Sequence, residues 1–194
     1  MGMTIQDGSS GKSAAVDNKF RLKTTAVVET ESLDATHDSR AYNINTGNIS
    51  LTSSTVSGVL YFKNNEDSSF ILEALAVGIG SAGTTTESSV ITLIRNPTTG
   101  TLISGASAVA MNQNRNFGTS DTLSASLAYK GAEGNTVTDG DAIAQFFQSS
   151  GGRLFAGINF ELQKGNSLAI TVDTNTSSGT TIIYAALIGY LETQ

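Results

Sequence analysis

The sequence predicts an all-β fold, an antiparallel β-sandwich of jelly-roll-like topology, and three observations carry this prediction. Apolar and polar residues alternate with a period of two along several segments, as they do along half-buried strands. Short clusters of Gly, Asn and Ser separate these segments, as turns separate the strands of a sandwich. Only 14% of the residues are charged, against roughly 25% in an ordinary domain. This scarcity of charge excludes a long charged helix or a coiled coil.

The composition supports one folded domain preceded by an arm. With 39% hydrophobic residues and a net charge of −6 over 194 residues, the chain can bury a core and does not have the composition of a disordered protein. We expect residues 19–194 to form a single β-sandwich domain, because this length fits one domain. Residues 1–18 are polar and rich in Gly and Ser. They predict an extended N-terminal arm that is either disordered or laid on a neighbour.

The first half of the domain is expected to consist mainly of strands. Residues 20–28 alternate in polarity, which predicts a half-buried strand. Residues 30–40 are acidic and polar, and they predict a loop or a short turn of helix. Residues 70–79 are nearly all apolar, and the glycines at their end favour a central strand with both faces covered over a helix. Further strands are expected at 43–52, 57–63 and 89–95.

The second half is expected to alternate loops with strands. Residues 96–100 carry the only Pro and predict a tight turn into a return strand. Polar loops are expected at 112–120 and 130–141. Strands are expected at 101–105, 121–129, 142–147, 153–162, 167–174 and 181–192. Long loops in the middle of the chain and tight turns near its end favour a jelly roll over an up-and-down barrel.

Charge and composition exclude several classes of partner. A net charge of −6 with scattered Lys and Arg argues against nucleic acid, because binding to phosphates needs clustered basic residues. The densest basic cluster, Lys19, Arg21 and Lys23, is interpreted as a solvated strand face. No stretch approaches the roughly 18 apolar residues of a membrane span, and the start lacks the apolar segment of a signal peptide. We therefore expect a soluble, unprocessed protein without a membrane or nucleic-acid partner.

No motif predicts catalysis or a cofactor. The absence of Cys excludes a thiol nucleophile and a thiolate metal site. The only histidine, His37, lies in a polar acidic segment and is interpreted as a surface residue. The segment GSSGKS at 8–13 has Gln6 where a phosphate-binding loop needs Gly, and GIGSAG at 78–83 is not followed by a helical pattern. We expect no enzyme activity, no cofactor and no metal.

Two further features leave alternatives open. Asp139 and Asp141 could share a calcium ion with Glu133, which would need six to eight oxygen ligands, but a solvated turn is the simpler interpretation. Phe117, in the segment NRNFGTS, is the one aromatic residue clearly placed in a polar loop. It is either an ordinary loop residue or a contact for a ligand or partner.

The opening IQDGSSGKSAAVDNKFRLKTTAV resembles the start of virion proteins of tailed bacteriophages, with an I-x-DG stretch and a linker of small residues before the first strand. Other segments are similar to the same group of β-rich phage structural proteins. These segments are AYNINTGNISLT, YFKNNED, VITLIRNPTTG, NQNRNFGTS, LAYKGAEG and GRLFAGINFELQKGNSLAI.

The resemblance implies a small β-sandwich that assembles on the virion and has no catalytic residues. It predicts a homo-oligomeric capsid decoration (cement) protein, with a trimer favoured, made in the cytoplasm of a bacterial host. Its partners would be the major capsid protein or other virion proteins. The alternative is a phage tail, neck or fibre component with a receptor- or carbohydrate-binding role. An enzyme such as a depolymerase or esterase is a third possibility, in which only His37 could supply an imidazole.

Overall fold

A computed structural model gives the structure of residues 4–6, 13–15, 30–52, 55–80, 88–104, 107–149, 151–175 and 179–193. The chain divides into two units, residues 1–30 and 31–194. In the first unit, β1 (Thr4–Gln6) and β2 (Ser13–Ala15) pair in antiparallel fashion, with Ile5 opposite Ala14. These two strands lie inside the predicted arm, whereas the predicted strand at 20–28 lies outside the described residues.

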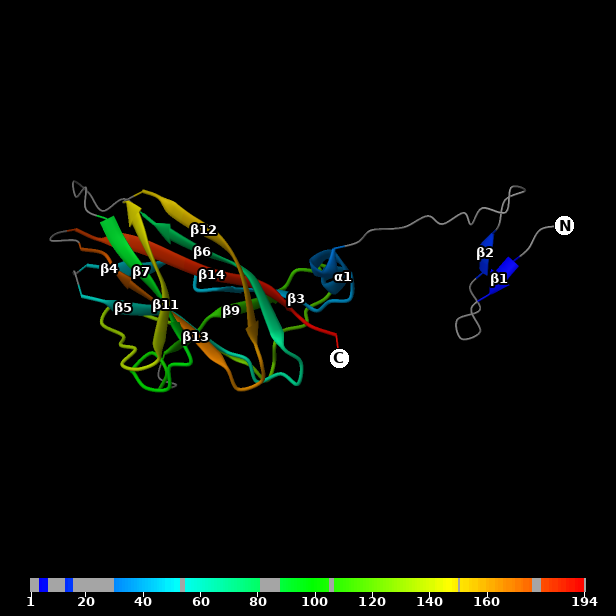
Figure 1. Cartoon of the computed structure of the whole chain (residues 1–194). Coiled ribbons are helices and arrows are strands. Elements are labelled where there is room, and N and C mark those ends of the chain that lie inside the picture. The colour runs from blue at the N-terminus through cyan, green and yellow to red at the C-terminus, as the bar shows by residue number, and fades with distance from the viewer. Residues whose placement is uncertain are drawn as a thin grey trace. The chain divides into compact units, whose positions relative to one another are not determined.

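The second unit is built from two six-stranded sheets (Figure 1). The first sheet has the order β11-β7-β13-β5-β10-β8. Its strands are β5 (Ser57–Lys63), β7 (Ser88–Arg95), β8 (Ala108–Val109), β10 (Leu127–Lys130), β11 (Asp141–Ser149) and β13 (Ser167–Asp173). The second sheet has the order β12-β6-β14-β3-β9, with β4 paired to β14. Its strands are β3 (Ala41–Asn45), β4 (Ile49–Leu51), β6 (Phe70–Ile79), β9 (Met111–Asn114), β12 (Arg153–Leu162) and β14 (Thr181–Leu191).

The pairing of the eight longest strands is that of a jelly roll. In chain order these strands are β3, β5, β6, β7, β11, β12, β13 and β14. The first pairs with the eighth, the second with the seventh, the third with the sixth and the fourth with the fifth, each time antiparallel. A long antiparallel hairpin wrapped into two sheets has this connectivity. The predicted all-β, antiparallel, jelly-roll-like sandwich is therefore confirmed.

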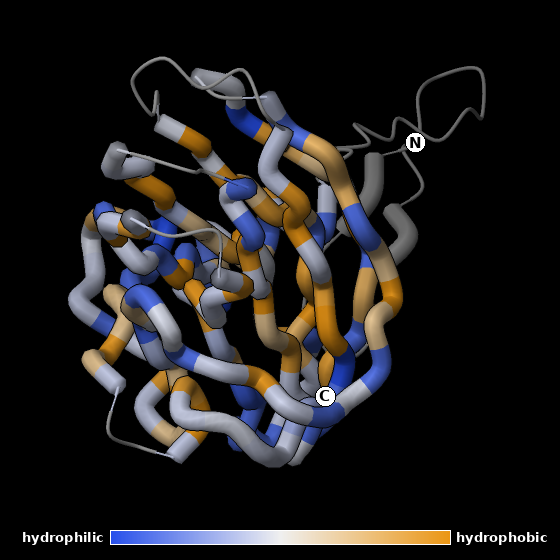
Figure 2. The backbone as a smooth tube through the Cα atoms, turned by 90° about the vertical axis from the view of Figure 1, so that its left-hand side faces the viewer, coloured by the Kyte–Doolittle hydropathy of each residue, from blue (hydrophilic) through white to orange (hydrophobic). Residues whose placement is uncertain are grey.

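One hydrophobic core lies between the two sheets and follows from the period-two pattern. Along β12, Leu154, Ala156, Ile158, Phe160 and Leu162 face the core and their neighbours face solvent, as the alternation predicts. Phe62 of the first sheet meets Phe70 of the second edge to face, with ring centroids 5.0 Å apart. Figure 2 shows hydrophobic positions recurring along the strands, while the connecting loops are mostly hydrophilic.

The short helix α1 (Glu31–His37) covers one end of the outer face of the second sheet. Its Ala35 is fully buried in a small cluster with Ala41 and Tyr190, and Ile71 packs against them. The predicted alternative of a short helical turn in 30–40 is thus correct. The cluster removes the Tyr190 hydroxyl from water and places it near Glu31, which together raise the pKa of Tyr190 to about 12.

The structure corrects four predictions. The single strand expected at 43–52 is interrupted at 46–48, where Gly47 takes a positive φ, and β3 and β4 pair separately with β14. Residues 101–103 form a turn rather than a return strand, because Leu102 is buried against Tyr61 and Ala169 on the outer face of the first sheet. The predicted loop at 112–120 begins as a strand, since residues 112–114 belong to β9 and pair with β3 at the edge of the second sheet, where polar residues are tolerated. The predicted strand at 121–129 is reduced to β10, which begins only at Leu127.

The interior position of β6 is confirmed, but its two faces differ. β6 lies between β12 and β14 in the second sheet. Its core-facing residues, such as Leu72 and Leu75, are fully buried, whereas Ile71 and Ala76 are only partly buried. The expectation that both faces are covered is therefore wrong for part of the strand. This uncovered part contributes to a surface described below.

Candidate interaction surfaces

The residues singled out for catalysis are not brought together. His37 is exposed in the last turn of α1. Of GIGSAG, Gly78 and Ile79 end β6, and residues 81–83 lie outside the described residues. Of GSSGKS, only Ser13 is described, as the first residue of β2. Within the described ranges there is no group of three or more His, Asp or Glu side chains that could hold a metal ion, and no helix that could span a membrane.

The three carboxylates considered for calcium serve three different structural partners. Asp139 accepts a hydrogen bond from the Thr98 hydroxyl and others from the backbone N–H groups of Thr99 and Thr98, each 2.8 Å long. These bonds favour the ionised form and lower the pKa of Asp139 to about 2. Asp141 pairs with Arg95 at 2.8 Å, and Glu133 accepts from Thr52. Asp139 and Glu133 thus each fasten one loop segment to another, and Asp141 links the ends of two neighbouring strands.

One side of the sandwich ends in two long edge strands, each paired on one side only among the described residues. β11 is the edge strand of the first sheet and β12 that of the second, and they are nine and ten residues long. Both carry large exposed apolar side chains: Phe147 on β11 is 73% exposed and Phe155 on β12 is 65% exposed. Exposed edge strands invite pairing with other chains, and buried aromatic residues dominate the energetics of many interfaces.

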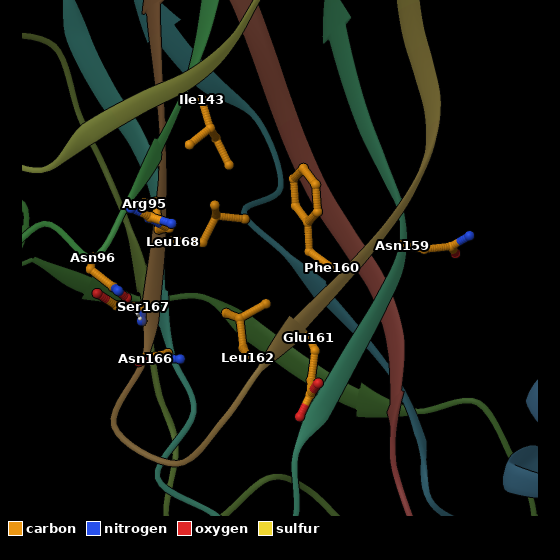
Figure 3. A pocket seen from close by; sticks show the side chains of 10 residues that line it. All are labelled: Arg95, Asn96, Ile143, Asn159, Phe160, Glu161, Leu162, Asn166, Ser167 and Leu168. Atoms are coloured by element: carbon orange, nitrogen blue, oxygen red, sulfur yellow. Dashed lines mark hydrogen bonds between the residues drawn. The ribbon is translucent and has the colours of Figure 1, made fainter.

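A crevice of about 390 Å³ lies between these two edges. Figure 3 shows Ile143, Phe160, Leu162 and Leu168 pointing toward one another into this hollow, while Asn159 points away from it. Ile143 comes from β11, Phe160 and Leu162 from β12, and Leu168 from β13. The crevice therefore offers an apolar floor at the open side of the sandwich, of a kind that accepts an apolar side chain of a partner.

The outer face of the second sheet is apolar over much of its area. Because strand pairing fixes the register, Phe155, Ala76, Ala186, Asn45 and Met111 form one row across all five strands. Phe155 and Met111, which is 50% exposed, stand at the two ends of this row, and alanines lie near its middle.

The adjacent row has the same character. Gly157, Ala74, Ile188, Asn43 and Gln113 lie side by side in the same order of strands. Neither row contains a charged residue. We call these two rows the apolar outer face. Among the described residues, α1 covers the sheet only beyond this face, at the row that contains Tyr190 and Ala41.

Phe117 projects from a loop whose backbone is fixed by side-chain hydrogen bonds. The Asn116 amide nitrogen donates to the Ser39 hydroxyl at 3.1 Å and to the His37 carbonyl at 3.3 Å, and its oxygen accepts from the Gly118 N–H at 3.0 Å. Phe117 itself is 98% exposed. It borders a hollow of about 450 Å³ whose other lining residues are amides, hydroxyls and one carboxylate: Asn112, Gln113, Asn114, Thr119, Ser120, Asp121 and Thr122. The loop thus holds an aromatic ring in water beside a polar hollow.

The apolar outer face and the edge crevice could not be located from the sequence. Alternation along each strand indicates which residues share a face, but not which strands lie side by side. Phe155 and Met111 are 44 positions apart and meet in one row only through β6, β14 and β3. The exposure of Phe155 nevertheless agrees with the alternation predicted for residues 153–162, which places Phe155 on the side that faces away from the core.

The chain has distant likenesses among solved structures and no match among protein families or curated proteins. No protein-family model matches the chain, and no curated protein matches it. Among solved structures, it is similar to a chain in the structure of deformed wing virus carrying the GFP gene, with 11% identity over 92% of this chain and 94% of that chain and a TM-score of 0.30. It is also similar to a chain in the structure of infectious bursal disease virus Gt strain, with 11% identity over 96% of this chain and 48% of that chain and a TM-score of 0.16. Both likenesses are too distant to carry an argument about function.

Proposed function

We propose that this protein is a non-enzymatic structural subunit of a virus particle, most specifically a capsid decoration protein that assembles as a homo-oligomer, with three copies as the expected number. The observation that carries the proposal is the concentration of exposed large apolar side chains on the free edges and one outer face of a jelly roll. Such surfaces suit a protein that acts by contact with other proteins. The segments that resemble virion proteins of tailed phages support the same role.

The fold is compatible with this role. Jelly rolls occur in viral capsid proteins and also in lectins and cupins, so the fold alone is an analogy. The carboxylates considered for metal binding are engaged in hydrogen bonds and an ion pair with other parts of the domain. Surface contact is therefore the function that the geometry supports best.

The mechanism is multivalent attachment. An oligomer that holds one weak particle contact keeps its other copies close to the neighbouring sites, and this effective concentration raises the overall affinity without any new contact. The free edge of β11 is the surface that we assign to the particle, because Phe147 is exposed on it and Ile143, four residues earlier, lines the edge crevice. A side chain of the shell protein would enter the crevice while β11 gains a neighbour.

The test uses purified oligomer and virus particles that lack decoration. Sedimentation of the mixture should carry the wild-type protein into the particle fraction in saturable amount. Phe147→Ser should lower this binding by about tenfold or more, as expected when a central aromatic contact is lost, while the solution mass and melting temperature stay unchanged. Saturable binding that is equal for the wild type and Phe147→Ser would refute the assignment of β11, and no binding by the wild type would refute the particle role.

A receptor- or carbohydrate-binding component of a phage tail, neck or fibre is the second candidate function, and the Phe117 loop is the observation that favours it. A fully exposed ring beside amides, hydroxyls and one carboxylate offers both an apolar platform and hydrogen-bonding groups to a sugar. A glycan array distinguishes this function: binding that is lost in Phe117→Ala supports it, and an array without binding counts against it.

A further inference from the structure

We propose that the apolar outer face is where copies of this chain meet, with Phe155 of one copy packed against Met111 of the next. This inference deepens the proposed function, because it locates the contact that makes the subunit an oligomer. It rests on the proposed function for the homo-oligomer, and its tests do not involve the particle.

The area of the apolar outer face suits the apolar centre of a protein–protein interface. Five strands span four spacings of about 4.8 Å, or roughly 19 Å. Along the strands, the two rows take up four residues, or roughly 13 Å at 3.3–3.4 Å per residue. The face thus covers about 250 Å² in the plane of the sheet, somewhat less than the roughly 300–600 Å² of the largest patches on monomers, which are often functional. A standard interface buries about 800 Å² per partner, so this face would supply the apolar centre of the contact.

Charge favours a second copy as the occupant. Residues 31–194 contain seven Lys or Arg and fourteen Asp or Glu, a net charge of −7. Two copies of a domain with this net negative charge repel each other where their charged surfaces approach. The two rows of the apolar outer face carry no charged residue, so this face allows close approach without placing like charges opposite each other. An acidic or basic partner would find no complementary charge there.

The arrangement within the row makes its two ends complementary to each other. The large side chains of Phe155 and Met111 project at opposite edges of the sheet. The small side chains of Ala76 and Ala186 lie between them, so the surface is lower in the middle of the row. A copy that approaches with its β12 edge brings Phe155 onto the β9 edge of the next, where a thioether and an aromatic ring make a favourable contact. Because each copy has one edge of each kind, the same contact repeats from copy to copy and can close a ring.

Cross-linking tests the pairing directly, because the chain has no Cys and any disulfide must come from introduced residues. Under mild oxidation, the double variant Phe155→Cys/Met111→Cys should form covalent oligomers, and their size on a denaturing gel gives the copy number. Neither single variant should cross-link when oxidised alone. A double variant that stays monomeric on the gel would overturn the proposal, as would efficient cross-linking of Phe155→Cys alone, which would place Phe155 against itself.

A second measurement guards against failure of the cysteine variants to fold. Light scattering across a dilution series should show that Phe155→Ser raises the concentration of half-dissociation by about tenfold or more, the effect of removing an aromatic anchor. The matched control is Phe147→Ser, an equally exposed phenylalanine on the edge of the other sheet, which should dissociate like the wild type. Equal masses for all three proteins, or a wild type that is a monomer at every concentration, would overturn the proposal. Because particle binding is assigned to β11, its failure would leave these results unchanged.

Discussion

Replacement of Asn64 by Leu tests how the two sheets are joined at one end of the sandwich. Asn64 follows β5 of the first sheet and is fully buried. Its amide nitrogen donates to the carbonyl of Leu162, at the end of β12 in the second sheet, at 2.8 Å and to the Ser68 carbonyl at 2.9 Å. Its oxygen accepts from the Glu66 N–H at 3.1 Å. One side chain therefore ties a strand end of each sheet to the turn between β5 and β6.

Leucine fills a similar volume but leaves these three backbone groups without a partner. An unsatisfied buried group costs about 1–3 kcal/mol. Only the bond to Leu162 is classed as fully buried, so water can replace part of the other two bonds, and we expect a total loss of about 3 kcal/mol in the free energy of unfolding. For a chain of this length, a loss of that size lowers the melting temperature by roughly 6–12 °C.

The assay is urea unfolding followed by circular dichroism at one fixed protein concentration, because assembly makes the apparent stability depend on concentration. Asn159→Ala is the matched control, since this exposed amide points away from the crevice (Figure 3) and should change the stability by less than about 0.5 kcal/mol. A loss below about 1 kcal/mol for Asn64→Leu, well short of the expected 3 kcal/mol, would refute the reasoning. A loss equal to that of the control would do the same.

Three further predictions concern the core, a close backbone approach and acid stability. Leu75→Ala, at a fully buried position of β6, should cost about 2–5 kcal/mol in urea unfolding; a cost below 1 kcal/mol would contradict the assigned core. Gly131→Ala should cost about 1–3 kcal/mol, because the added Cβ would meet the backbone of Gly58, and an unchanged melting temperature would refute this. Asp139 has a pKa of about 2 in the fold against an ordinary 3.8, so the stability it contributes is present above pH 4 and is lost as the pH falls toward 2. Asp139→Asn should therefore lose less stability between pH 4 and pH 2 than the wild type, and equal losses would count against the role of its bonds to the 98–99 turn.

The sequence was sufficient for the class of fold and for most of the strands. The strands at 57–63, 70–79 and 153–162 were placed at the bounds that the structure shows. Period-two alternation placed 153–162, and the apolar run that ends in glycines placed 70–79. The prediction of a return strand at 101–105 failed because Leu102 is buried by a loop that folds over the first sheet, and burial in a loop looks the same in sequence as burial in a strand. The strand at 111–114 was missed because an edge strand tolerates polar residues.

The interaction surfaces depended on tertiary register and were only partly visible in the sequence. Phe117 was identified because it is aromatic in a polar segment, and the structure places it in water beside a hollow. Whether Phe117 binds anything stays a prediction. Phe155 and Met111 gave no signal of their own, because their common row exists only after four strand pairings have formed.

The central claim, that this protein is a structural component of a virus particle, is tested most directly by quantitative mass spectrometry of particles purified from the cells that produce it. The account predicts peptides of this chain in the particle fraction at many copies per particle, in a fixed ratio to the major shell protein that survives washing with salt. Peptides found only in the free protein fraction, with none in the particles, would contradict it.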